Sequence, residues 1–343
     1  MNIIGGEYPF LLNEYTFSEN NVLNYLTSFD KNMYLFSTGR DCFYSIFSSI
    51  EGKTLWLPDF LCKSIVQPLE NLNVNYRFYN VGKNLRVSGS NDIREGDYAL
   101  IISYFGFVDN DFYNFVLMKK CNIISDVTHL FFDSEQMAKV TAISSFVVGS
   151  LRKFFAIPDG AFILTNENVS IKGDTRINFV KDRTYGLFSR YYSLVNSFDN
   201  EENMPILKQA EKELDESFDF GYSISYLSYN ILKCISPKLY VERIKNNFNF
   251  LNNYFGLKYR FFSPYFPLVF FDNATRDYYR RKLSSKWIFA PIHWDTSFLG
   301  KKKNILSDLI LSIPCDYRYN VDDMKKICEL IDKSSVYSSE NTI

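Results

Sequence analysis

The stretch that decides the fold runs from residue 121 to 166 and reads CNIISDVTHLFFDSEQMAKVTAISSFVVGSLRKFFAIPDGAFILTN. An apolar run ends on Asp126, and His129 follows three residues later. Two β-forming runs, 142–150 and 161–165, then flank Lys153. The stretch therefore delivers an acid, an imidazole and a lysine at predicted strand ends. This arrangement suits a cofactor that needs a buried carboxylate at one end and an amine nucleophile at the other.

The residues before this stretch alternate between short apolar runs and helix-like segments, which indicates an α/β fold with a mostly parallel sheet. Ligands of such sheets lie beyond the carboxyl ends of the strands. Thr38, Asp59, Tyr104 and Asp126 all fall at such ends, so we expect separate motifs to converge on one pocket. The expected strands cover residues 33–37, 54–57, 75–81, 98–104 and 123–126, in addition to the two above.

The pattern changes after residue 166. Residues 171–203 are polar and aromatic without a clear period, which predicts a long excursion over a partner subunit. Residues 206–256 are helical in pattern, 264–271 and 287–291 resemble strands, and 321–332 form an amphipathic helix. We therefore predict a large α/β domain over residues 1–205 and a smaller α+β domain over 206–343.

Composition excludes several classes of protein. Of 343 residues 46% are apolar, which is enough for a sizeable core, and the net charge of −1 without a basic stripe argues against nucleic-acid binding. Six cysteines show no CxxC pair, and no signal peptide opens the sequence, so a reduced cytoplasmic setting is expected. The apolar run 98–108 is too short to span a membrane, and no metal site is expected.

A predicted strand, the turn Thr38-Gly39-Arg40 and a helix start follow one another directly. Free amide N–H groups at such a helix start form an anion site. An ordinary N-cap, with Thr38 or Asp41 satisfying those amides, explains the motif equally simply and is favoured on the motif alone.

Asp126, His129 and Lys153 each suit an ordinary role when taken singly, as a turn carboxylate, a packed imidazole and a surface lysine. Burial or the adjacent Arg152 would lower the pKa of Lys153 and make it nucleophilic toward carbonyl groups. Together, the three residues in this order and spacing favour a site for pyridoxal phosphate (PLP). The aspartate of such a site pairs with the pyridinium nitrogen, so the ring acts as an electron sink.

The chain resembles the DegT/DnrJ/EryC1/StrS family of PLP-dependent sugar aminotransferases, which have the aspartate-aminotransferase fold (fold type I). The resemblance covers roughly residues 5 to 333. It rests on Gly5-Gly6 and on the motifs STGRDCFYSIF, LWLPDFLCKSIVQPL, IISDVTHLF, GSLRKFFAIPDGAF, KNNFNFL, APIHW and SIPCDYRYNVDDM.

The resemblance implies a role for each motif residue. Lys153 would form the internal aldimine with PLP and then move the proton between cofactor and substrate. Asp126 would hold the pyridinium nitrogen, and His129 would hydrogen-bond the ring's 3-oxygen. The phosphate would be held by the Ser150 hydroxyl and by the amides of Gly39, Arg40 and Asp41.

The ring cover and the substrate contacts depart from the common family pattern. Cys62 occupies the position at which many relatives place an aromatic residue over the ring, and Phe60 close by is the other candidate for the cover. His293 falls where relatives place a substrate-facing residue. Arg318 could bind a substrate carboxylate or form an ion pair with Asp316 or Asp322. In this family a loop of one subunit usually completes the phosphate site of its neighbour. Arg183 and Tyr185 are the candidates for that loop here, on position alone.

The resemblance implies an aminotransferase that moves an amino group from a donor, glutamate, to a keto acceptor. The expected acceptor is a nucleotide-linked keto sugar for surface polysaccharide (O-antigen or capsule) or related glycan biosynthesis, in a homodimer with shared active sites. A smaller carbonyl compound of the same kind of pathway, a deoxysugar dehydratase and a non-catalytic relative are the alternatives. Lys153 argues against the dehydratase, in which some relatives have histidine instead.

Overall fold

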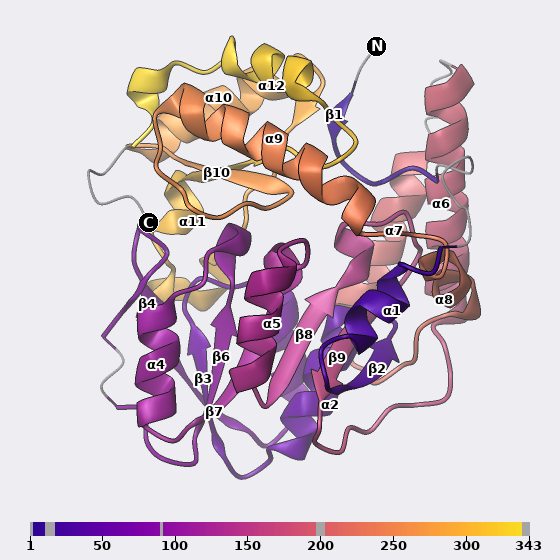
Figure 1. The fold of residues 1–343 in the computed structure, drawn as a ribbon, viewed down its shortest axis with the longest axis vertical. Helices are drawn as coiled ribbons and strands as arrows, with labels where there is room; N and C mark the ends of the chain where they lie inside the picture. The colour runs from indigo at the N-terminus through magenta and orange to yellow at the C-terminus, as the bar shows by residue number, and fades with distance from the viewer. Residues whose placement is uncertain (1–2, 11–17, 90–91, 197–202, 338–343) are drawn as a thin grey trace.

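An eight-stranded sheet forms the centre of the computed structural model, which describes residues 3–10, 18–89, 92–196 and 203–337 (Figure 1). The strand order is β2-β9-β8-β7-β6-β3-β4-β5. The strands are β2 (Asn32–Phe36), β3 (Thr54–Pro58), β4 (Asn75–Val81), β5 (Val87–Ser88), β6 (Tyr98–Ile102), β7 (Asn122–Asp126), β8 (Phe146–Ser150) and β9 (Ala161–Thr165). The predicted α/β fold with a mostly parallel sheet is confirmed.

The strand directions bring the predicted site residues to one edge. Strands β8, β7, β6, β3 and β4 run parallel to one another. Strand β9 is antiparallel to both β8 and β2, so β2 runs in the same direction as β8. The carboxyl ends of β2, β3, β6, β7 and β8 therefore lie at the same edge.

The central strands are buried because helices cover the sheet. Residues Ala99–Ile102 of β6 and all of β9 are buried, which explains their continuous apolar sequence. Helices α4 (Asn110–Met118) and α5 (Ser134–Ile143) lie across the face nearer the viewer in Figure 1. Each begins at an aspartate N-cap, Asp109 or Asp133, whose carboxylate accepts from a first-turn amide.

The C-terminal residues form a second group of elements above the carboxyl edge of the sheet (Figure 1). Strands β10 (Tyr265–Val269) and β12 (Ile310–Pro314) pair antiparallel, and helices α9 (Lys238–Phe255), α10 (Asn273–Ser284) and α12 (Val321–Cys328) pack around them. Strand β1 (Ile4–Gly5) pairs with β11 (Ile288–Phe289), so the first described residues join the C-terminal group. The division of the chain at residue 205 stays a prediction.

Two local patterns differ from those read in the sequence, whereas the excursion of 171–203 over a partner subunit stays a prediction. The segment 171–203 contains the 20-residue helix α6 (Ile177–Asn196), and residues 197–202 lie outside the described residues. Its helical period is hidden in the sequence because α6 exposes aromatic side chains such as Tyr185 while burying Phe179 and Leu187. The run 142–150 is not all strand, since α5 continues to Ile143 and β8 begins at Phe146.

The remaining elements connect these layers. The helices are α1 (Val22–Thr27), α2 (Gly39–Ser49), α3 (Lys63–Val66), α7 (Asn203–Glu216), α8 (Tyr226–Leu232) and α11 (Leu306–Leu309). The 3₁₀ segments are η2 (Gln67–Asn71), η3 (Tyr104–Gly106), η4 (Thr128–Leu130), η5 (Leu151–Lys153), η6 (Ser297–Lys302) and η7 (Lys333–Ser335).

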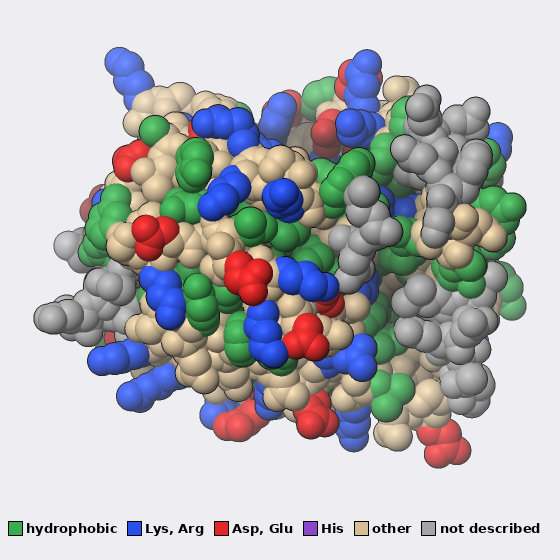
Figure 2. Space-filling model, turned by 90° about the horizontal axis from the view of Figure 1, so that it is seen from above, with side chains coloured by type: hydrophobic (Ala, Val, Ile, Leu, Met, Phe, Trp, Pro, Cys, Tyr) green, Lys and Arg blue, Asp and Glu red, His purple; other side chains and the backbone are tan. Residues whose placement is uncertain are grey.

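Three general features of the structure bear on the classes of protein considered above. Acidic and basic side chains are interspersed over the face shown in Figure 2, without a large region of one sign. Among the described residues, no helix has both the length and the apolar character needed to cross a membrane. Within the same residues, no group of three or more histidine, cysteine, aspartate or glutamate side chains could hold a metal ion.

A buried polar contact joins the sheet edge to the C-terminal group. The Asp59 Oδ1 atom, just after β3, accepts from the Asn304 amide at 2.7 Å and from the Val81 N–H at 2.9 Å. Burial raises the pKa of Asp59, and these two donors oppose that rise. Asn304 also donates to the Val81 carbonyl, so one buried amide joins the Asp59 carboxylate to the last residue of β4.

We expect Asn304→Ala to lower the free energy of unfolding by about 1–3 kcal/mol, because a buried carboxylate and a carbonyl lose their donor. Urea unfolding measures this change. Asn249→Ala, on the exposed side of α9, is the matched control and should leave the midpoint unchanged or slightly higher. A midpoint for Asn304→Ala equal to that of the control would contradict this role.

Candidate active site

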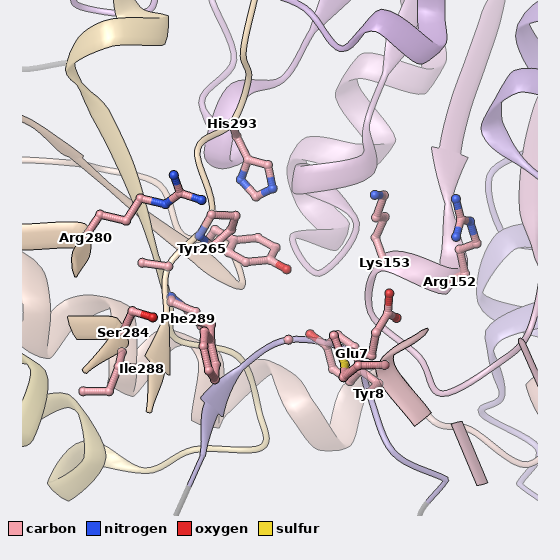
Figure 3. A pocket seen from close by; sticks show the side chains of 15 residues that line it. Glu7, Tyr8, Arg152, Lys153, Tyr265, Arg280, Ser284, Ile288, Phe289 and His293 are labelled. Atoms are coloured by element: carbon pink, nitrogen blue, oxygen red, sulfur yellow. The ribbon is translucent and has the colours of Figure 1, made fainter. Parts of the chain in front are cut away.

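Lys153 opens into a cavity of about 420 Å³ at the carboxyl edge of the sheet (Figure 3). It ends η5, the 3₁₀ turn that directly follows β8, and the N–H groups of Leu151 and Arg152 fix this turn by donating to the Gly160 carbonyl. The Lys153 side chain is exposed to this cavity, which is itself open to solvent on one side. The protein atoms around the amine reduce its hydration and so lower the pKa of Lys153, and the Arg152 cation lowers it further.

Arg152 takes part in a network of partly buried ion pairs beside the lysine. Its guanidinium pairs with both carboxylate oxygens of Glu211 on α7, at 2.5 and 3.1 Å. Arg183 on α6 binds Glu7 through two contacts of 3.0 Å and approaches Glu211 at 3.3 Å. Burial acts to raise the pKa of Glu211, but the two arginines outweigh it and lower that pKa to about 2. The network therefore stays ionised and holds η5 against α6 and α7.

Asp126 ends β7 as predicted, and its side chain lies close to Lys153. Its Oδ1 atom accepts from the Thr128 N–H at 2.9 Å. Burial raises the pKa of Asp126, whereas Thr128 and the Lys153 cation act to lower it. A carboxylate with a raised pKa gains stability from any further cation or N–H donor placed beside it.

His129 lies in η4, one turn beyond Asp126, and is buried. Burial lowers its pKa to about 3, with Lys153 adding to the effect, so the imidazole is neutral near pH 7. Its Nδ1 atom accepts from the Phe105 N–H at 3.2 Å. The proton therefore resides on Nε2, which makes His129 a hydrogen-bond donor.

The start of α2 has both features considered from its sequence, a side-chain N-cap and free amide N–H groups. Thr38 and Asp41 form a capping box, in which the Asp41 N–H donates to the Thr38 hydroxyl at 3.4 Å. The N–H groups of Gly39 and Arg40 have no acceptor within the described part of the chain. No atom lies within 4 Å of the position that a Cβ on Gly39 would take, so space is open beside these amides.

The side chains of this turn have other partners. The Arg40 guanidinium donates to Gln67 at 2.8 Å and forms an ion pair with Asp215. The Asp41 carboxylate accepts from Arg176 at 3.0 Å. Ser150, at the end of β8, is partly buried, and its N–H donates to the Thr128 hydroxyl at 3.1 Å. These contacts leave the amides of Gly39 and Arg40 and the Ser150 hydroxyl as the available donors.

The two candidates for the ring cover differ in their surroundings. Phe60 is fully buried and packs against Tyr104 at 5.3 Å between ring centroids. Cys62 is half-buried, and its sulfur accepts from the Ser64 hydroxyl at 3.0 Å. The ring that stacks on His129 is Trp294, with centroids 5.4 Å apart and planes at 16°. Trp294 follows His293 in the sequence, and the aromatic pair in APIHW is the signal that could have identified it.

The two predicted substrate residues lie in different environments. His293 borders the cavity, its ring meets Tyr265 edge-on at 4.7 Å, and burial lowers its pKa well below the usual range. Arg318 instead forms a two-contact ion pair with Asp316, at 2.8 and 2.9 Å, which is the structural alternative. Arg183 is likewise paired with Glu7 of the same chain.

Sequence reasoning missed several residues that line the cavity. They come from segments far apart in the sequence, so no local motif signals them. They are Glu7 and Tyr8 of the N-terminal segment, Tyr265 of β10, and Arg280 and Ser284 of α10.

Comparison with solved structures identifies the fold. A candidate sugar aminotransferase of Streptococcus pneumoniae, Spr1654 in its PLP form, matches with a TM-score of 0.63 at 10% identity, covering 96% of this chain and 97% of that one. The Escherichia coli GDP-4-keto-6-deoxy-D-mannose 3-dehydratase with bound hydrated PLP matches with 0.61 at 11%, covering 97% and 100%. A DegT DnrJ EryC1 StrS aminotransferase from Brucella abortus matches with 0.58 at 13%, covering 93% and 91%.

These matches show that the chain has fold type I of the PLP-dependent aminotransferases. The resemblance inferred from the motifs is thereby confirmed at the level of the fold. No family model matches the chain, and neither does any curated protein.

The residues at the sheet edge fit PLP by their chemistry. Asp126 offers a carboxylate to a ring nitrogen, His129 offers an N–H to a ring oxygen, and Lys153 offers an amine to an aldehyde. The open space beside the unpaired amides of Gly39 and Arg40 suits a phosphate at the start of α2.

We expect His129 to make the stability of the cofactor-free protein depend on pH. Its pKa is about 3 in the fold and 6.5 in the unfolded chain, so the unfolded chain binds more protons between these values. The free energy of unfolding therefore falls as pH drops from 6.5 toward 3. His129→Asn keeps an acceptor for Phe105 and should reduce this fall by up to about 1.4 kcal/mol per pH unit.

Urea unfolding of both proteins at about pH 7 and about pH 4.5 tests this expectation. The carboxylates that titrate in this range are shared by the two proteins and cancel in the difference. An identical fall in both would show that His129 is not neutral in the fold.

Proposed function

We propose that the protein is a PLP-dependent aminotransferase in which Lys153 carries the cofactor. The observation that carries the proposal is the position of Lys153: it borders a cavity beside Asp126, and burial and Arg152 lower its pKa. A lowered pKa increases the fraction of neutral amine, which is the form that attacks a carbonyl carbon. The fold likeness to PLP-dependent aminotransferases supports this reading.

Bound PLP would supply an electron sink that stabilises negative charge at the substrate carbon. Asp126 would keep the ring nitrogen protonated. Its buried carboxylate has lost solvation, and a protonated ring nitrogen beside it would stabilise its negative charge. His129 would donate from Nε2 to an oxygen of the ring. Lys153, once released, would accept the proton from the substrate carbon and return it elsewhere, as a general base and acid.

The amino donor in this proposal is glutamate, and the acceptor is a nucleotide-linked keto sugar of surface polysaccharide or related glycan synthesis. A small carbonyl compound of the same kind of pathway is the second candidate for the acceptor. The dehydratase among the structures of similar fold makes sugar deoxygenation the competing reaction. Lys153 favours transamination over that reaction. We also propose that the protein acts in the cytoplasm.

We expect Lys153→Ala to abolish the visible absorption of the lysine-linked cofactor and to lower transamination by roughly 10²–10⁴-fold, because it removes the amine that acts as base. Borohydride reduction followed by peptide mass spectrometry should locate the cofactor on Lys153 of the wild type. Glutamate should remove the visible band of the wild type, and a keto acceptor should restore it.

Lys258→Ala, an exposed lysine outside the cavity, is the matched control and should behave as the wild type. Restoration by a small keto acid, but not by nucleotide keto sugars, would favour the second acceptor. A wild type that shows no cofactor band, or a Lys153→Ala variant that cycles normally, would overturn the proposal.

We also propose a homodimer with shared active sites, formed through α6. Five apolar side chains of this helix are half or more exposed, and the last four have helical spacing: Ile177 (73%), Tyr185 (51%), Phe188 (50%), Tyr192 (55%) and Val195 (61%). Such a stripe on an ordinary surface helix is costly to leave in water. The helix stands at one edge of the molecule, where a second copy could cover it (Figure 1).

We expect Phe188→Asp combined with Tyr192→Asp to convert the dimer to a monomer, because two charges would be buried in the apolar contact. Size-exclusion chromatography with light scattering reports the mass. Met118→Asp, which adds a charge at an even more exposed apolar residue on α4, should leave the dimer intact. A double variant with the same mass as the wild type would exclude α6 from the interface.

A further inference from the structure

The cavity next to Lys153 has a charge that its own residues do not balance. Of its lining cations, Arg152 is neutralised by Glu211, and the lining carboxylate of Glu7 is neutralised by Arg183. Lys153 and Arg280 remain. Within the described residues, the Arg280 side chain has no ion pair and no hydrogen bond, although it is one helical turn from the paired Arg276.

Arg280 and Lys153 lie on opposite sides of the cavity, with His293 and Tyr265 between them (Figure 3). The Arg280 guanidinium points inward from α10. Ser284, one turn further along the same helix, also lines the cavity and adds a hydroxyl. A substrate that reacts at Lys153 and crosses the cavity would therefore end beside a guanidinium.

Two polar atoms of the cavity lining lack partners. The Tyr8 side chain is 4% exposed, and its hydroxyl has no hydrogen-bond partner among the described residues. The buried Nδ1 atom of His293 likewise has none. Buried polar atoms of this kind are rarely left unsatisfied, so both side chains are candidates for contact with a polar ligand.

We propose that Arg280 determines specificity by binding an anionic group of the substrate, at the opposite end from the carbon that reacts at Lys153. The ligand chemistry is an oxyanion, phosphate or carboxylate, joined to a polar body that meets Tyr8 and His293. A planar guanidinium binds two oxygens of either group at once. The inference rests on the proposed function for the identity of the reacting end, whereas the anion site rests on the cavity alone.

The cavity volume supports a ligand larger than the oxyanion alone. About 420 Å³ lies within the range of sites that enclose small organic molecules. When Lys153 is joined to a carbonyl group, it is no longer a free ammonium, and Arg280 is then the unpaired cation of the cavity lining. A substrate with a negative charge at its distal end would neutralise Arg280.

Isothermal titration of the PLP-loaded protein with three probes tests the proposal. The probes are uridine diphosphate, 2-oxoglutarate and uridine, which carry phosphate, carboxylate and no anionic group. We expect Arg280→Gln to raise the Kd of one of the two anionic probes by about 10- to 100-fold, because a charged hydrogen-bonded pair is lost. Arg280→Lys should restore part of the affinity, and uridine should show no difference.

Arg281→Gln is the matched control, since this neighbouring arginine is exposed, as Arg280 is, but does not line the cavity. A Kd effect with uridine diphosphate assigns the anion to phosphate, and one with 2-oxoglutarate assigns it to carboxylate. Equal affinities of wild type and Arg280→Gln for both anions would overturn the proposal. If the protein does not take up PLP, the same titrations on the cofactor-free protein still test Arg280, so failure of the anion site and failure of the proposed function are distinguished.

Discussion

The ion pair between Arg152 and Glu211 is the contact on which the rest of the site depends. It holds a cation next to Lys153 without leaving that cation unpaired, at a partly buried position. A buried charge that loses its partner costs several kcal/mol, so neither residue can be removed alone without disturbing the turn that carries Lys153. The pair also attaches this turn, which follows the central strand β8, to helix α7 outside the sheet.

The same charges set the reactivity of the lysine. Burial and Arg152 lower the pKa of Lys153, while Glu211 and Glu7 act to raise it. Arg183 links the two carboxylates and, by neutralising them, limits how far they oppose Arg152. The ion pairs that stabilise the fold here therefore also set the pKa of the Lys153 amine. A substitution that changes the stability of this network also changes that pKa.

The sequence was sufficient to predict the sheet edge and the residues on it. Apolar runs that end on Asp126 and before Lys153 define strand ends, and parallel strands bring such ends together. Helix α6 could not be predicted in the same way, because its exposed aromatic stripe obscures the helical period. Trp294 stacks on His129 only because the C-terminal group folds over the sheet, a contact between distant segments that no local pattern reveals.

The residues suited to the cofactor and those suited to the substrate come from different parts of the chain. The groups suited to PLP come from the sheet edge, whereas much of the opposite wall of the cavity comes from α10, β11 and the N-terminal segment. That segment is positioned by the β1–β11 pair and by Arg318, which donates to the carbonyls of Gly6 and Glu7 while bound to Asp316. Arg318 thus acts on the cavity through Glu7 and Tyr8. Because recognition in the proposed site would depend on such long-range contacts, its residues could change without altering the strand ends that would hold the cofactor.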